Sequence, residues 1–315
     1  MKPPAIVRPS TFARSLALAA AGGAGCVASA LFLGACGQLL GISSWVDVGE
    51  SSDAASDAAT DGKAIDATGP TPEGASNVCP SPVAGGAPGV RIDAVGGTPA
   101  YCIDATETTM ALYQRFLNDP SINPPAGAPP ECAWNTEYGF EYQPYSNVPD
   151  ASDLPVTAVH WCDAWGFCNY WGKHLCGNRA DGGPIDPSLA TGPASQWEYA
   201  CAGPNANQFP YGSVYDASAC RTGLPPSAGA GPVPTPTCVG GFPGLYDMSG
   251  NLEEWENSCI RSDGGDPRWD RCQLRGGTFF FPVGSLDCPT PDYNDRNGGD
   301  AGGSSAVTIR CCWEP

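Results

Sequence analysis

Hydrophobic residues recur at helical spacing in only two parts of the chain, and elsewhere glycine and proline interrupt the pattern every few residues. One helix is predicted to begin at Thr108 as its N-cap, because apolar residues three and four positions apart follow it. A second is predicted over residues 160–171, where tryptophans have the same spacing. A third, short helix is predicted over residues 195–198, which have capping-box spacing. The rest of the chain is expected to form turns and short strands.

Residues 1–35 have the composition of an export signal rather than of a folded domain. Three basic residues precede a run of small and apolar residues, which ends in a lipobox at residues 33–36. This pattern is typical of a bacterial signal peptide that is cleaved before a cysteine, here Cys36, which then carries lipid. A single transmembrane anchor is the alternative, because the apolar run is nearly long enough to span a bilayer. In either case the rest of the chain is expected outside the cytoplasm.

Residues 36–84 are predicted to be an acidic, low-complexity tether. Small and polar residues predominate there, and such a segment buries too little apolar surface to offset the entropy of ordering it. The residue after Cys36 is Gly37 rather than an aspartate, which favours the outer membrane of a Gram-negative bacterium. The predicted location is therefore the cell envelope, with the lipid at Cys36 in the membrane.

The charge of the chain excludes one class of partner. The formal net charge is −18, and the predicted leader holds three basic residues and no acidic ones, so the mature chain is more negative still. A surface this acidic repels nucleic acid and anionic lipid, and no nucleic acid is expected as a partner. It is compatible with calcium.

Sixteen cysteines indicate an oxidising compartment. Fourteen of them follow Cys36, an even number, and in an exported chain these are expected to form disulfides. A zinc site is the alternative, but the sequence has no Cys-x-x-Cys pair and only two histidines, His160 and His174. The same shortage of histidine disfavours a hydrolase built on a Ser-His or Cys-His pair.

Two motifs in the last quarter of the chain carry a resemblance to a known family. Residues 247–255 read Asp-Met-Ser-Gly-Asn-Leu-Glu-Glu-Trp, and residues 275–278 read Arg-Gly-Gly-Thr. Together they resemble the C-terminal half of the formylglycine-generating enzyme (sulfatase-modifying factor) family. Further segments match the family pattern in order along the chain, at residues 101–109, 155–164, 168–175 and 196–200.

The resemblance covers most of residues 85–315, which are predicted to form a single sulfatase-modifying-factor-like domain. It implies an α+β fold of the formylglycine-generating enzyme type, which is irregular, loop-rich, C-type-lectin-like and stapled by disulfides. It also implies two disulfide pairings, Cys168 with Cys311 and Cys201 with Cys288. The remaining cysteines cannot be paired from their spacing.

The first motif also implies a structural calcium ion. In the family this segment binds calcium, and the ligands that carry over are the side chains of Asp247 and Glu254 and the main-chain carbonyls of Gly250 and Leu252. Hard oxygen ligands that converge at one turn suit Ca²⁺. The alternative is a structural turn in which Asp247 accepts hydrogen bonds from backbone amides and Trp255 fills the core.

The second motif is followed by a departure from the family pattern. Active members place two cysteines shortly after Arg-Gly-Gly, and these bind the copper that activates oxygen. The corresponding positions here are Phe281 and Leu286, and neither side chain can bind a metal. Copper(I) prefers soft thiolates, and a site of this type needs two of them side by side. Copper is therefore not expected as a cofactor, and no catalytic residue is predicted.

These observations favour a lipid-anchored, non-catalytic module for binding or surface display, with a protein or a glycan as its ligand. Polar insertions at residues 177–194 and 224–237 would form its binding surface. The alternative is a formylglycine-generating oxidase that converts a sulfatase cysteine with an atypical thiol site. An enzyme of some other chemistry is a third hypothesis, but no set of residues supports it, and a shared fold does not imply a shared activity.

Overall fold

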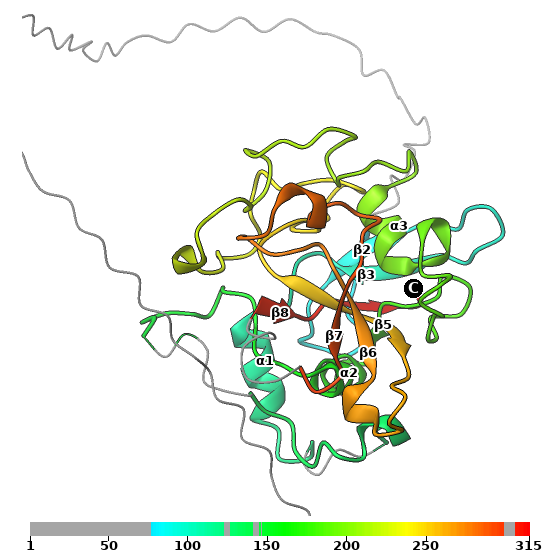
Figure 1. Ribbon diagram of the computed structural model, residues 1–315, viewed down its shortest axis with the longest axis vertical. Coiled ribbons are helices and arrows are strands. Elements are labelled where there is room, and N and C mark those ends of the chain that lie inside the picture. Colours follow the sequence, from blue (N-terminus) through cyan, green and yellow to red (C-terminus); the bar gives the residue numbers. More distant parts are fainter. Residues whose placement is uncertain (1–76, 123–126, 141–144, 146, 299–305) are drawn as a thin grey trace, which may run out of the picture. The chain divides into compact units, whose positions relative to one another are not determined.

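The computed structural model describes residues 77–122, 127–140, 145, 147–298 and 306–315 (Figure 1). The predicted signal peptide, Cys36 and all but the last residues of the predicted tether lie outside these ranges. Within them, no helix is both long and apolar enough to cross a membrane. The lipid anchor and the tether boundaries therefore stay predictions.

Three α-helices form in the regions where the sequence predicts them (Figure 1): α1 (Met110–Leu117), α2 (Trp161–Tyr170) and α3 (Gln196–Ala202). The N-cap of α3 is Ser195, whose hydroxyl accepts a hydrogen bond from the third residue of the helix. The N-cap of α2 is His160, which forms a capping box with the third helical residue. Short 3₁₀ helices occupy η1 (Pro130–Cys132), η2 (Gly192–Ala194), η3 (Pro226–Ala228), η4 (Pro267–Trp269) and η5 (Val283–Ser285).

The prediction that Thr108 caps the first helix is wrong by one residue. The N-cap is Thr109, whose hydroxyl accepts a hydrogen bond from the backbone N–H of Leu112 at 3.3 Å. Thr108 is held instead by its own backbone. Its N–H donates to the carbonyl of Ile309 at 2.8 Å, and its carbonyl accepts from the N–H of Val156 at 2.7 Å. These two bonds keep Thr108 outside the helix.

A five-stranded sheet brings together distant parts of the sequence. Its order is β1-β2-β3-β9-β4, and all neighbouring strands are antiparallel. The strands are β1 (Val78–Cys79), β2 (Gly89–Ile92), β3 (Tyr101–Asp104), β9 (Cys311–Trp313) and β4 (His174–Leu175). The last strand along the chain, β9, therefore lies between two strands that precede it by more than a hundred residues.

A four-stranded sheet brings the two sequence motifs together. Its order is β7-β6-β5-β8, with β5 and β8 parallel and the other neighbours antiparallel. The strands are β7 (Asp292–Asp295), β6 (Arg271–Arg275), β5 (Glu253–Ile260) and β8 (Val307–Thr308). In this register Glu254 of the first motif is paired with Arg275 of the second. The turns of both motifs consequently lie at the same end of the sheet.

Buried apolar side chains form two main cores. In the first core, aromatic residues of α1 and α2 such as Phe116 and Phe167 belong to one cluster with Trp255 of β5. In the second core, residues of the five-stranded sheet such as Ile103 cluster with Trp197 of α3. This mixture of few helices, two small sheets and long loops is the predicted α+β class.

Seven disulfides connect these elements, and every cysteine in the described part of the chain belongs to one of them. The pairs are Cys79–Cys102, Cys132–Cys162, Cys168–Cys311, Cys176–Cys312, Cys201–Cys288, Cys220–Cys238 and Cys259–Cys272. The two pairings that the resemblance implies are both present, each with Cα atoms 5.6 Å apart.

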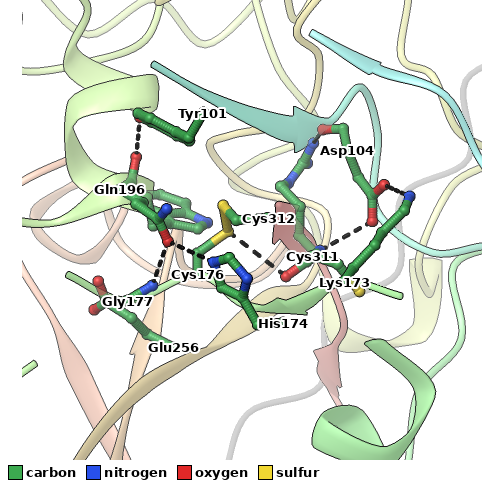
Figure 2. The surroundings of a disulfide bond; sticks show 12 residues. Tyr101, Asp104, Lys173, His174, Cys176, Gly177, Gln196, Glu256, Cys311 and Cys312 are labelled. Carbon is green, nitrogen blue, oxygen red and sulfur yellow. Dashed lines mark hydrogen bonds and ion pairs between the residues drawn. A yellow bond between two sulfur atoms is a disulfide. The ribbon is translucent and has the colours of Figure 1, made fainter. Parts of the chain in front are cut away.

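Around Cys176–Cys312, polar contacts link three strands and α3 (Figure 2). The side-chain carbonyl of Gln196 accepts a hydrogen bond from the N–H of Gly177 at 2.9 Å and lies 3.2 Å from Nε2 of His174. On the other side of the bridge, the buried ammonium of Lys173 lies 2.5 Å from Oδ1 of Asp104. The disulfide is thus embedded in a fully packed, hydrogen-bonded region.

Candidate functional site

The turn of the first motif has a left-handed backbone that is held by a buried carboxylate. Asp247 and Asn251 have φ values of 59° and 56°, and Gly250 has a φ of 74°. The carboxylate of Glu107 accepts hydrogen bonds from the side-chain amide of Asn251 at 2.6 Å and from the N–H of Leu252 at 3.0 Å. These bonds stabilise a conformation that residues other than glycine rarely adopt.

The two carboxylates expected to bind calcium have protein partners in this structure. Asp247 accepts hydrogen bonds at both of its oxygens from the N–H of Thr235, at 3.2 and 2.9 Å. Glu254 is held at both oxygens by the guanidinium of Arg310, and its Oε2 also accepts from the indole N–H of Trp197 at 2.6 Å. Asp247 therefore accepts hydrogen bonds from a backbone amide, as expected if this segment is a structural turn rather than a calcium site.

Negative charge still exceeds positive charge in this cluster. Burial, followed by the charges of Asp247 and Glu254, raises the pKa of Glu107 well above its ordinary value. Burial also raises the pKa of Asp247. Three buried carboxyl groups thus surround the single cation Arg310, and either protons or a further cation must balance them.

A complete metal cage is not formed by these side chains. Across the described ranges, no group of three or more His, Cys, Asp or Glu side chains could hold a metal ion. The side chains of Asp247 and Glu254 are also committed to the partners named above. Calcium at Asp247, Gly250, Leu252 and Glu254 therefore stays a prediction, and the surplus negative charge is the observation in its favour.

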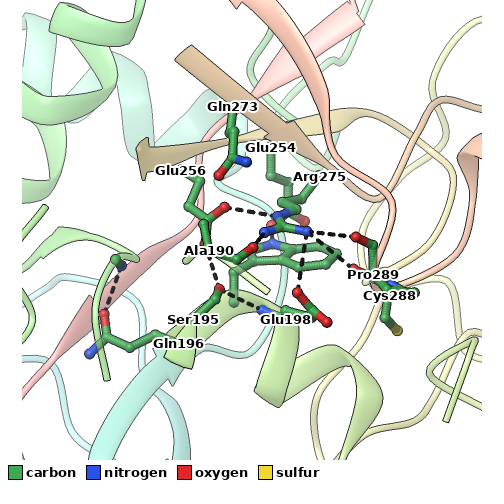
Figure 3. Close-up of polar contacts among 12 residues, drawn as sticks. Ala190, Ser195, Gln196, Glu198, Glu254, Glu256, Gln273, Arg275, Cys288 and Pro289 are labelled. Carbon is green, nitrogen blue, oxygen red and sulfur yellow. Dashed lines mark hydrogen bonds and ion pairs between the residues drawn. The ribbon is translucent and has the colours of Figure 1, made fainter. Parts of the chain in front are cut away.

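The arginine of the second motif joins several segments from inside the protein (Figure 3). Arg275 is 1% exposed, and its Nε donates to Glu256 at 2.8 Å while Nη1 lies 3.5 Å from Glu198. Its Nη2 donates to the carbonyl of Ala190, which belongs to the first polar insertion. It also donates to the carbonyl of Cys288 at 3.5 Å. Arg275 is consequently a structural centre that fixes the loop following the motif.

Large apolar side chains occupy the positions where the family resemblance places its reactive cysteines. Leu286 is fully buried, and Phe281 is half-buried with its ring edge-on to that of Phe280 at 5.1 Å. Cys288, the cysteine nearest to them along the chain, is bridged to Cys201. Since all described cysteines are in disulfides, this region offers no thiolate. The donor set therefore does not fit copper(I), which needs two soft sulfur ligands.

A small polar cavity lies beside this same loop. Its volume is about 170 Å³, and its lining includes Glu253, Gly277 and Asp292. Burial, followed by the charge of Asp292, raises the pKa of Glu253 to about 8. Sequence analysis did not single out Glu253, because the resemblance assigns a role to the adjacent motif residue Glu254 and none to Glu253. An acidic residue at the start of an otherwise buried strand is the signal that could have identified it.

A larger cavity of about 670 Å³ lies beside α3. Its lining includes Pro193 from the first polar insertion, Glu198 and Tyr199 from α3, and Asn207 and Gln208 from the following loop. Burial raises the pKa of Glu198. The first insertion thus contributes to a hollow that is lined by both an aromatic ring and amide groups.

Similarity to known proteins agrees with this geometry. Residues 92–314 match the family described as the sulfatase-modifying factor enzyme 1-like domain. A mouse (Mus musculus) protein named inactive C-alpha-formylglycine-generating enzyme 2 is 29% identical over 167 residues, which cover 48% of this chain and 44% of that protein. The chain therefore matches less than half the length of this curated relative.

Three solved structures are also similar at low sequence identity. CarF has a TM-score of 0.45 and 20% identity, covering 69% of this chain and 87% of its own. PvdO from Pseudomonas aeruginosa has a TM-score of 0.47 and 15% identity, with coverages of 69% and 81%. Treponema denticola variable protein 1 has a TM-score of 0.45 and 16% identity, with coverages of 76% and 92%. On the match of residues 92–314, the chain belongs to the sulfatase-modifying factor enzyme 1-like domain family.

Proposed function

We propose that this protein is a non-catalytic member of its family, anchored to the cell envelope by lipid, that binds a protein or glycan ligand. The observation that carries the proposal is that the protein's described cysteines are all paired in disulfides. Phe281 and Leu286 occupy the positions of the reactive pair, and Cys288 is bridged to Cys201. Without two free thiolates, the family's copper-dependent oxidation has no site in the described part of the chain.

The similarity to a mouse protein that is named inactive supports the same conclusion. The buried ion pairs give a second reason. Arg275 of the second motif and Arg310 bind carboxylates deep inside the domain, so both arginines stabilise the scaffold and present no charge to a substrate. The scaffold of the family is thus retained while its reactive sulfur pair is missing.

The proposed ligand-binding surface is the region of the first polar insertion. Residues 177–194 lie beside the cavity of about 670 Å³, to which Pro193 and Tyr199 contribute. The ring of Tyr199 is covered on one side by the guanidinium of Arg179, 3.6 Å from the ring centre. Aromatic rings and amide side chains around a hollow are suited to both peptides and sugars.

The envelope location is proposed from the sequence of residues 1–84. A lipid on Cys36 followed by an acidic, low-complexity tether would hold the domain at a distance from the membrane. Mass spectrometry of the natively expressed protein tests this, since the mature chain is expected to begin at lipid-modified Cys36. A mature chain that retains residues 1–35 would contradict it.

The absence of oxidase activity is tested by copper binding and by turnover. The purified domain is expected not to compete with a copper(I) chelator and not to convert the cysteine of a co-expressed sulfatase peptide to formylglycine. A variant with both Phe281→Cys and Leu286→Cys serves as a positive control for copper binding, and each single substitution is its matched control. Formylglycine formed by the unmodified domain would establish the oxidase instead.

A further inference from the structure

The small polar cavity beside residues 276–286, here called the altered loop, contains an acidic group without a counter-charge. It has a volume of about 170 Å³ and is lined by Glu253, Leu274, Gly277, Ser285, Thr290, Pro291 and Asp292. Glu253 begins β5 and is 5% exposed, and its Oε1 has no hydrogen-bond partner among the described residues. A buried carboxyl group without a partner destabilises a fold unless something else satisfies it.

A second carboxylate lines the same cavity from another strand. Asp292 begins β7, and in the sheet register it is paired with Leu274 of β6. Glu253 and Asp292 thus approach the cavity from the two strands on either side of β6. No lysine or arginine is among the residues that line it. The cavity therefore presents carboxyl groups from two sides and no positive charge.

The backbone around Gly277 brings the altered loop over the cavity. Gly277 has a φ of 66°, and a Cβ at this position would collide with the carbonyl oxygen of Ser285. Glycine is therefore required for the close approach of the loop. On the same loop Phe280 and Val283 are exposed to 36% and 43%, although both are large and apolar. Phe280 and Val283 therefore offer apolar surface on the same loop that lines the cavity through Gly277 and Ser285.

We infer that this cavity binds the ammonium group of a lysine side chain on a partner polypeptide, whose neighbouring apolar residue packs on Phe280 and Val283. A lysine fits because its ammonium is a compact point charge with three donors on an apolar stem. A divalent metal fits less well, because the cavity supplies two carboxylates and metal sites of this kind use more oxygen ligands. The inference rests on the proposed binding function and adds a contact with a polypeptide partner at a cavity other than the one beside α3.

The charge of the whole molecule favours the same partner. With a formal net charge of −18, the protein attracts basic polypeptides and repels acidic ones before contact. The buried position of Glu253 then adds selectivity, because only a side chain long enough to enter the cavity reaches it. The loop that replaces the family's reactive pair thereby becomes the place where a partner is recognised.

The test uses a short peptide with one lysine between two leucines, blocked at both ends, and the same peptide with norleucine in place of lysine. Calorimetric titration of the intact domain is expected to detect the lysine peptide and to show at least roughly tenfold weaker binding of the norleucine peptide. Glu253→Gln is expected to weaken binding of the lysine peptide by a similar factor, and Asp292→Asn to weaken it less. Asp263→Asn, which removes one exposed acidic group elsewhere, is the matched control and is expected to leave binding unchanged.

Equal binding of both peptides, or unchanged binding by Glu253→Gln, would overturn the inference. Binding of butylamine as strongly as the peptide would overturn the polypeptide part of it, and binding of Ca²⁺ alone with no peptide binding would assign the cavity to a metal. Because Asp292 is exposed, Asp292→Asn provides a readout even if Glu253→Gln fails to fold. Copper and formylglycine assays decide the proposed function separately, so failure of the lysine test leaves that result unaffected.

Discussion

Arg310 holds both carboxylate oxygens of Glu254, with Nε 2.7 Å from Oε2 and Nη2 2.8 Å from Oε1. Both side chains are almost completely removed from solvent. The same guanidinium donates to the backbone carbonyl of Asp104 at 2.8 Å and to that of Tyr246 at 2.9 Å. One side chain thus joins β5, the end of β3 and the turn of the first motif.

Glu254→Gln is expected to destabilise the domain by about 3–5 kcal/mol, because it leaves the charge of Arg310 buried without its partner. Chemical denaturation of the purified domain measures this change. Asp93→Asn, which breaks the exposed pair of Asp93 with Arg91, is the control and is expected to have no measurable effect. Similar stabilities for the two variants would show that Glu254 and Arg310 are not paired in solution.

Removal of the Cys201–Cys288 bridge by a double substitution to serine is expected to destabilise the domain by roughly 4–5 kcal/mol in the chain-entropy model, because the bridge closes a loop with a sequence separation of 87. In the unmodified protein, Cys288 is expected not to react with a thiol probe unless reductant is added. Mass spectrometry of labelled peptides checks this. Labelling of Cys288 under native, oxidising conditions would revive the oxidase hypothesis.

Calcium is expected to raise the thermal midpoint of unfolding, because a ligand that binds only the folded state stabilises it. Asp247→Asn is expected to abolish the increment. It is a cleaner test than Glu254→Gln, since Glu254 also neutralises Arg310. Thermal denaturation in chelator and in excess calcium measures the effect. Identical midpoints in the two conditions would leave a structural turn, held by Glu107 and Asn251, as the role of this motif.

Stability is expected to fall as the pH is lowered from about 7.5 to about 5.5, in part because of His174. Burial lowers the pKa of His174, although the charge of Glu314 and a hydrogen bond with Gln196 oppose the shift. Because the folded pKa lies below the unfolded one, the neutral imidazole contributes stability above about pH 6.5, and this contribution is lost as pH falls through the folded pKa. His174→Gln is expected to flatten the pH dependence, which denaturation across this range measures. An unchanged slope would contradict the buried neutral state.

Hydrophobic periodicity predicted the first two helices because their buried faces are regular in sequence, and capping-box spacing predicted the third. The sequence predicts the second helix over residues 160–171, and α2 lies between the caps His160 and Trp171. The choice of Thr108 over Thr109 failed because both threonines can cap a helix. The Thr108 backbone is hydrogen-bonded to residues distant in sequence, and this leaves Thr109 as the N-cap. Such long-range pairing cannot be predicted from local sequence.

The candidate site was only partly accessible from sequence for a similar reason. Motif spacing placed Asp247 and Glu254 at one turn, and the family resemblance implied that Phe281 and Leu286 replace two thiols. It did not identify Glu107, which reaches the turn from a segment more than a hundred residues away. Buried ion pairs of this kind depend on the tertiary arrangement of strands, which sequence periodicity does not encode.

The adjacent cysteines of β9 have a consequence for how the protein acquires its covalent structure. Cys311 belongs to the first core and bonds to Cys168, whereas Cys312 belongs to the second core and bonds to Cys176. Neighbouring residues of a strand point to opposite faces, so a slip of one residue would turn each thiol away from its partner. The two native disulfides therefore form together only when β9 is paired in the correct register. A misaligned molecule lacks these two native bridges and can be distinguished chemically from one whose sheet is correctly assembled, by mapping which cysteines are paired.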